Sequence, residues 1–152
     1  MGTINLGRVI LGGIVAGIVG NILGYLVDGV ILAPQWAAAM QALGKTDFTT
    51  NQIIGFNVSG LVSGVFGVWL YAAMRPRYGA GPKTAILAGL ALWVAGTLLP
   101  NATFMGIVGL FPQNLAVMTT LAGVVVSVLA ILAGASLYKE STETARTMSA
   151  RA

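Results

Sequence analysis

Four stretches of this chain are long and apolar enough to cross a lipid bilayer, and its charged residues stand almost entirely between them. A helix needs about 20 apolar residues to span the hydrocarbon core, where its backbone must satisfy its own hydrogen bonds. We therefore predict an all-α integral membrane four-helix bundle formed by residues 1–139. The predicted helices cover about residues 8–33, 52–74, 84–110 and 115–138.

Composition excludes most classes of soluble protein and several kinds of chemistry. Hydrophobic residues make up 57% of the chain and charged residues 8%, against about 25% charged residues in soluble domains. The chain has no Cys and no His, which excludes disulfides, Cys/His zinc sites and Ser–His or Cys–His catalysis. No acid–base pair and no set of metal ligands converges in the predicted spans. We therefore expect neither an enzyme nor a cofactor, and the net charge of +4 gives no indication of nucleic-acid binding.

The distribution of Lys and Arg predicts the orientation of the helices. In the predicted topology, only Lys45 lies on one side of the bilayer. The other side carries Arg8, Arg75, Arg77, Lys83, Lys139, Arg146 and Arg151. Because Lys and Arg concentrate in cytoplasmic loops, both termini, the basic loop and a polar tail over residues 140–152 are expected in the cytoplasm. Arg75, Arg77 and Lys83 are also candidates for contact with anionic lipid headgroups.

The segment between the first two spans, "PQWAAAMQALGKTDF", contains its own helical pattern. Trp36, Met40 and Leu43 recur at helical spacing, and tryptophan favours the membrane–water interface. We predict a short helix lying in the outer interface. A solvated loop is the alternative.

Three short sequence matches recur in the same order in the two halves of the chain. The matched segments are residues 10–13 with 86–89, 32–35 with 110–113, and 67–71 with 134–138. They suggest a tandem repeat of two helical hairpins that share one orientation, although Gly and Leu are common enough here for chance matches. In this register Pro100 aligns with Gly24 and forms an internal kink of a helix that runs to Leu110. The alternative is a helix that ends at Leu99.

Small residues line one face of several predicted helices. The glycines at helical spacing that we assign to helix packing are Gly13, Gly17, Gly24, Gly60, Gly64 and Gly67. Glycine lets membrane helices approach backbone to backbone. Packing within one chain is the simplest interpretation, and an interface between subunits or a groove for lipid is the alternative.

Asp28 is the only acidic residue within a predicted span. Ionisable residues are costly in a bilayer and often functional there, but Asp28 falls near the outer end of its helix. In an antiparallel hairpin Asn57 is level with it, so one interpretation is a hydrogen-bonded pair with Ser59 or Asn21 as a further partner. Simple exposure is a second interpretation. The third is a proton- or cation-coupled polar site around the Gly24 and Pro100 interruptions. Its candidate residues are Asn21, Asp28, Asn57, Thr97 and Asn101.

Two segments, "NLGRVILGG" and "WLYAAMRPRYGAGPKTA", resemble small four-helix bacterial membrane proteins of unassigned function. This resemblance implies a bacterial cytoplasmic membrane and brings no activity with it. The leading hypothesis is a structural or accessory subunit that packs through its Gly-rich faces in a homo-oligomer or a larger complex. A small oligomeric transporter or channel using Asp28 and the Gly24/Pro100 breaks is the second hypothesis. Binding of a lipid, quinone or pigment between helices is the third.

Overall fold

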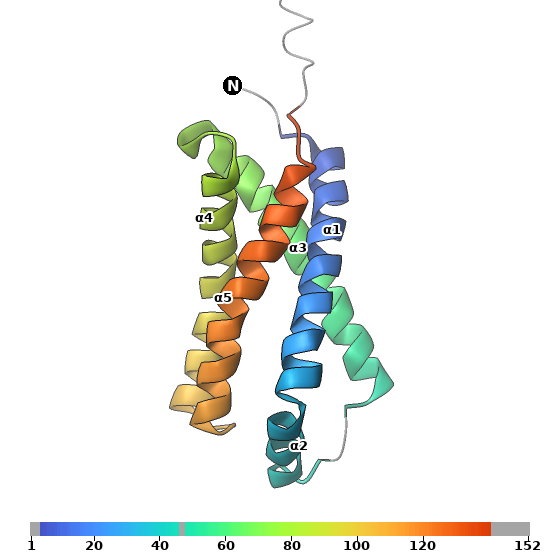
Figure 1. The fold of residues 1–152 in the computed structure, drawn as a ribbon, viewed down its shortest axis with the longest axis vertical. Helices are drawn as coiled ribbons and strands as arrows, with labels where there is room; N and C mark the ends of the chain where they lie inside the picture. The colour runs from blue at the N-terminus through green and yellow to red at the C-terminus, as the bar shows by residue number, and fades with distance from the viewer. Residues whose placement is uncertain (1–3, 46–47, 141–152) are drawn as a thin grey trace, which may run out of the picture.

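The computed structural model describes residues 4–45 and 48–140, and every element in these residues is helical (Figure 1). The elements are α1 (Leu6–Gly24), η1 (Tyr25–Ile31), α2 (Ala33–Ala42), α3 (Thr50–Tyr78), α4 (Pro82–Trp93), η2 (Val94–Leu98), η3 (Asn101–Ile107) and α5 (Gln113–Ser136). Four continuous helical stretches are long and apolar enough to cross a membrane: Leu6–Ile31, Thr50–Tyr78, Pro82–Ile107 and Gln113–Ser136. The chain is therefore a multi-pass helical membrane protein, as its sequence predicts. Apart from Glu140, the predicted polar tail lies outside the described residues.

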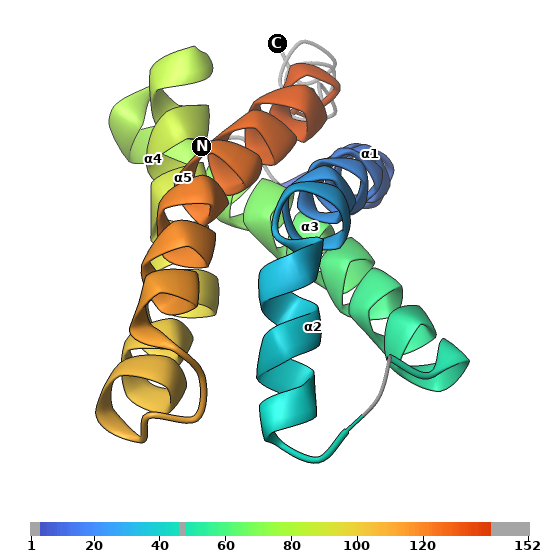
Figure 2. The same cartoon turned by 60° about the horizontal axis from the view of Figure 1, so that its bottom comes forward.

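The transmembrane helices pack as two antiparallel pairs, α1 with α3 and α4 with α5. Between the pairs, α1 runs along α5 and α3 contacts α4. The pairs meet closely where α1 begins, α5 ends and α3 turns into α4, which we call the closed end. They diverge toward the opposite, splayed end, where α2 lies (Figures 1 and 2).

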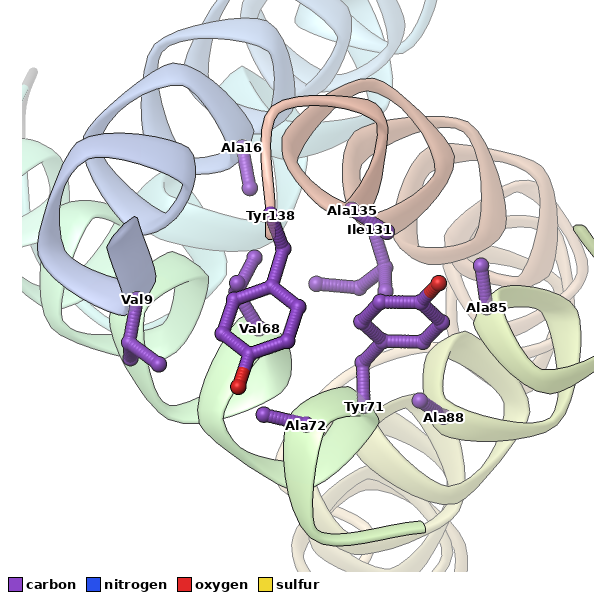
Figure 3. Close-up of a cluster of buried hydrophobic side chains, with 10 residues drawn as sticks. All are labelled: Val9, Ala16, Val68, Tyr71, Ala72, Ala85, Ala88, Ile131, Ala135 and Tyr138. Carbon is purple, nitrogen blue, oxygen red and sulfur yellow. The ribbon is translucent and has the colours of Figure 1, made fainter. Parts of the chain in front are cut away.

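Short side chains let the helices meet at the closed end, and aromatic rings fill the remaining space. Buried residues from α1, α3, α4 and α5 form one cluster there (Figure 3). Its members are Val9, Ala16, Val68, Tyr71, Ala72, Ala85, Ala88, Ile131, Ala135 and Tyr138. A smaller cluster at the splayed end holds Leu32, Ala39, Met105 and Leu115 together. It attaches α2 to η3 and to the start of α5.

The predicted short helix between the first two spans is present as α2, which starts with Pro34 in its first turn. Its Met40 is buried and Trp36 is half-buried. Its location in the outer interface remains a prediction. The next helix, α3, starts at a capping box in which Thr49 and Gln52 bind each other's backbone N–H groups.

The turn between α3 and α4 is shorter than the sequence predicts. The helix predicted to end at Met74 continues through Pro76 to Tyr78, and α4 already begins at Pro82. Gly79 and Gly81 make the turn with φ angles of 83° and 133°, which disfavour other residues. The predicted basic loop is therefore largely helical.

Thr84 fastens this turn, and its hydroxyl should contribute measurably to stability. It is 1% exposed, and its Oγ1 donates to the carbonyl oxygens of Gly79 at 2.7 Å and Tyr78 at 3.3 Å. Thr84→Val keeps the shape but leaves both carbonyls without this donor, so we expect it to lower the free energy of unfolding by about 1–2 kcal/mol. Reversible unfolding in mixed micelles measures the change. Thr103→Val, at an exposed position, is the control, and equal losses in both variants would contradict the role of Thr84.

The helix continues through Pro100, but its hydrogen-bonding pattern changes there. It passes through wide π-helical turns on both sides of Pro100; the Leu99 N–H, for example, donates to the carbonyl of Val94. Proline lacks an N–H and its ring clashes with the carbonyl four residues earlier, so widened turns are a local way to accommodate it. The early end at Leu99 is thus wrong.

The end predicted at Leu110 is also wrong, by three residues. The helix stops at Ile107, where Gly109 adopts a φ angle of 68° and the Leu110 N–H donates to the carbonyl of Phe104 at 3.0 Å. This bond spans one residue more than the closing bond of a Schellman cap, in keeping with the π-helical turn that it ends. Gly109, one residue before the predicted end, was the available signal.

The first transmembrane helix of each pair contains a π-helical segment, and the two segments lie at equivalent positions. The π-helical segments η1 and η3 start at residues 25 and 101 and end at 31 and 107, a constant separation of 76 residues. Each follows an interruption that the sequence had aligned, Gly24 in one and Pro100 in the other. Both widened segments lie at the splayed end (Figure 1).

Candidate functional site

A crevice of about 460 Å³ lies between the two helix pairs at the splayed end. This volume is in the range of pockets that bind small molecules, roughly 300–1,000 Å³. The crevice takes its walls from all four transmembrane helices and from α2. Its lining residues are Gly24, Val27, Asp28, Trp36, Phe56, Gly96, Thr97, Asn101, Thr119, Gly123, Val126 and Ser127. The lining combines one carboxylate, three hydroxyl groups, one side-chain amide, two aromatic rings and small apolar groups.

Asp28 is held in this crevice by α2. The indole Nε1 of Trp36 donates a hydrogen bond of 3.1 Å to its carboxylate. The Trp36 ring is fixed in turn by edge-on contacts with Phe111 and Phe48, with ring centroids 5.3 Å and 6.4 Å apart. No Lys or Arg lines the crevice, and among residues 4–45 and 48–140 the one ion pair joins Arg75 to Glu140. The carboxylate therefore has a hydrogen-bond donor but no counter-ion in the described structure.

Asn101 spans from η3 to α5 on the opposite wall. Its Nδ2 donates to the hydroxyl oxygens of Thr119 at 3.2 Å and Thr120 at 2.9 Å. Each of these hydroxyls donates its own proton to a backbone carbonyl of the preceding turn. Since a hydroxyl has one proton to give, neither can donate to Asn101. The amide nitrogen must face α5, and the Asn101 carbonyl oxygen is left as an acceptor.

The structure brings together only part of the predicted polar site. Asp28, Thr97 and Asn101 line the crevice with Gly24, whereas Asn21 and Asn57 do not. The Asn21 amide donates to the backbone carbonyl of Asn57 at 3.0 Å and ties α1 to α3.

The predicted pairing of Asp28 with Asn57 is wrong. The Asn57 amide turns back along its own helix to the carbonyl of Ile53, at 2.8 Å. Asp28 instead binds Trp36, because the chain bends at Leu32 after η1 and α2 packs against η1. The prediction assumed that Asp28 and Asn57 lie at the same height in an antiparallel hairpin. Equal height does not determine which face of each helix a side chain occupies.

The contribution of α5 and of Trp36 to the crevice was not predicted from the sequence. Thr119, Gly123 and Ser127 recur at every fourth residue and form one small, partly polar face of α5. That spacing was visible in the sequence. The hydrogen bond from Trp36 to Asp28 depends on the path of the chain between α1 and α3, which no local pattern shows.

Five of the six glycines predicted to pack are used inside this one chain. A Cβ atom at Gly17 would lie 2.6 Å from the Cα of Leu61, and Gly13 and Gly64 approach backbone atoms of the facing helix equally closely. A Cβ at Gly60 would meet the Asn21 side chain, and one at Gly67 would meet Ile131. Gly24 differs, because nothing lies within 4 Å of its missing Cβ. It lines the crevice instead.

At the closed end, Arg75 has an internal position rather than the predicted one among lipid headgroups. Its guanidinium carbon lies 5.2 Å from the ring centroid of Tyr138 and 5.8 Å from that of Tyr71, and its side chain is 16% exposed. The Nη1 atom of Arg75 lies 3.5 Å from Oε1 of Glu140. Arg77 and Lys83 are exposed, so the headgroup role stays a prediction for these two.

The hydroxyl groups of the two tyrosines form hydrogen bonds between the helix pairs. The Tyr71 hydroxyl, from the first pair, accepts from the backbone N–H of Gly81 at 3.3 Å, and Gly81 caps α4 of the second pair. Tyr138, after α5, accepts in the same way from Asn5, the cap of α1. The tyrosine rings contact each other edge-on, with centroids 5.9 Å apart (Figure 3). The closed end is thus fastened by reciprocal contacts.

Comparison with protein-family models, curated proteins and solved structures finds no match to this chain. The site is therefore interpreted from its geometry.

Proposed function

We propose that this membrane protein is a small transporter that binds its solute in the crevice between its two helix pairs. One observation carries the proposal: a polar, carboxylate-containing crevice lies between the pairs at the splayed end, while apolar packing seals the other end. Alternating access requires two rigid halves that can rock about a site between them. Irregular helical segments lining such a site are a recurrent feature of transporters, and both η1 and η3 are adjacent to the crevice.

We also infer that the two pairs are a tandem repeat, which supports rocking of two equivalent halves. The contact of Gly13 with Val65 in the first pair is matched by that of Gly89 with Val128 in the second. Gly60 against Asn21 is matched by Gly123 against Thr97. These correspondences relate α3 to α5 by 63 residues, about one helical turn less than the 67 residues that separate Tyr71 from Tyr138. They support the repeat together with the paired π-helical segments, whereas the tyrosine match belongs to a different register of α5.

The hypothesis of an accessory subunit is less well supported. It relied on Gly-rich faces free to receive a partner, and those faces are occupied by neighbouring helices of the same chain. A homo-oligomer formed through other surfaces remains compatible with the transporter and is part of the proposal.

The membrane orientation is proposed from charge. Among the described residues, Arg8, Arg75, Arg77, Lys83 and Lys139 lie at the closed end and Lys45 lies at the splayed end. The positive-inside rule then places the closed end in the cytoplasm of a bacterial cell and directs the crevice outward.

Single-cysteine labelling tests the proposal, because the chain has no Cys of its own. Ser127→Cys places a thiol in the crevice, and Ser63→Cys makes the same change at an exposed, lipid-facing position of α3. A membrane-impermeant maleimide reacts with a hydrated thiolate, so Ser127→Cys should react about tenfold faster from the outer side. A transporter must also expose this position, more slowly, to the inner side of inverted vesicles.

The labelling pattern separates the alternatives. Reaction of Ser127→Cys from the outer side alone would indicate a fixed binding site and contradict transport. A rate no greater than that of Ser63→Cys from either side would show that no aqueous crevice exists.

A further inference from the structure

Asp28 and Asn101 present hydrogen-bond acceptors to the crevice. The carboxylate of Asp28 accepts one hydrogen bond, from Trp36, and has further acceptor capacity. Asn101 uses its amide protons on Thr119 and Thr120, which leaves its carbonyl oxygen. The hydroxyl protons of these threonines are committed to backbone carbonyls. A ligand that donates hydrogen bonds or carries positive charge would complement this lining.

The charge of the crevice is also uncompensated. No basic side chain lines it, and Asp28 forms no ion pair within the described residues. A carboxylate in a membrane span is costly unless it is paired. A bound cation would supply the missing counter-charge.

The walls favour an organic cation over a metal ion. Metal ions such as Ca²⁺ and Mg²⁺ take about six or more oxygen ligands, usually with several carboxylates, and the described residues hold no group of three or more His, Cys, Asp and Glu side chains. The crevice offers instead the rings of Trp36 and Phe56 together with Val27 and Val126. Aromatic faces attract ammonium groups, and apolar walls match an organic body.

We propose, on the basis of the transporter function above, that the solute is an organic ammonium ion whose charged head is held by Asp28. Trp36 both orients the carboxylate and contributes to the aromatic wall. Asn101 supplies a second acceptor from the opposite helix pair, so a bound ammonium ion would bridge the two halves.

A set of three probes tests this inference with the full-length protein in lipid nanodiscs. Benzyltrimethylammonium carries the charge, neopentylbenzene has nearly the same shape without it, and benzylsulfonate carries a negative charge. Binding is measured by equilibrium dialysis against empty nanodiscs, which corrects for partition into lipid. We expect the ammonium ion to bind at least about tenfold more tightly than either other probe.

Substitutions of Asp28 test its role directly. Asp28→Asn should weaken binding of the ammonium ion by about tenfold or more and leave neopentylbenzene unaffected, whereas Asp28→Glu should retain most of the preference for the cation. Glu140→Gln makes the same carboxylate-to-amide change at the closed end and should alter neither probe.

The outcomes distinguish this inference from the proposed function. Equal binding of the ammonium ion and its neutral isostere, unchanged binding in Asp28→Asn, or no binding of any probe would overturn the cation inference. The transporter proposal would still stand if Ser127→Cys were labelled from both sides of the membrane.

Discussion

Replacing Gly17 with alanine is expected to lower the free energy of unfolding by about 1–3 kcal/mol, although the change adds a single methyl group. The added Cβ would lie 2.6 Å from the Cα of Leu61 and 3.0 Å from the carbonyl oxygen of Gly60. Both are backbone atoms of α3, so no rotamer change relieves the contact and α1 must move away. Separation of α1 from α3 sacrifices the close packing that holds membrane helices together.

Gly24→Ala is the matched control, because it makes the same change on the same helical stripe of the first transmembrane helix. Nothing lies within 4 Å of the position of its added Cβ, and alanine favours a helix over glycine by about 0.5–1 kcal/mol. We expect Gly24→Ala to be neutral or slightly stabilising. Reversible unfolding in mixed micelles measures both variants. Equal effects at Gly17 and Gly24 would show that α1 and α3 do not approach as closely as described.

The same two glycines show what the sequence could and could not predict. Helical spacing placed both glycines on one face of the helix. Gly17 does pack there, against the backbone of α3. Gly24 lies where α1 passes into η1 and the helix pairs diverge, so it borders the crevice. A periodic pattern indicates which residues share a face, but only the relative tilt of the helices determines where contact ends.

The membrane class, the four spans and the helical segment over α2 follow from hydropathy and spacing, which are local properties. The local interruption at Pro100 was also predictable, since proline cannot take part in the regular helical hydrogen bonding. The partners of Asp28 and Asn101 were not predictable in the same way. Trp36 and Thr120 reach them from separate elements, through the bend at Leu32 in one case and the packing of α5 in the other.

Tyr138→Ala is expected to lower the free energy of unfolding by about 3 kcal/mol and to loosen the closed end. The Tyr138 side chain is 6% exposed, contacts the ring of Tyr71 and covers the guanidinium of Arg75. Removal of the ring leaves a cavity between α1, α3 and α5 and admits water to Arg75. Tyr138→Phe should cost only about 1 kcal/mol, since it removes just the hydroxyl that accepts from Asn5.

Tyr25→Ala controls for the loss of an aromatic ring, since Tyr25 is 67% exposed and its removal should change stability by no more than about 0.5 kcal/mol. The second measurement is the labelling rate of Ser127→Cys from the inner side. If the closed end is the barrier to inward opening, Tyr138→Ala should raise that rate and Tyr25→Ala should not. Loss of stability without faster inward labelling would mean that Tyr138 is a packing residue alone, and that the barrier to the cytoplasm lies deeper, at Val68 and Ile131, which are completely buried between the helix pairs.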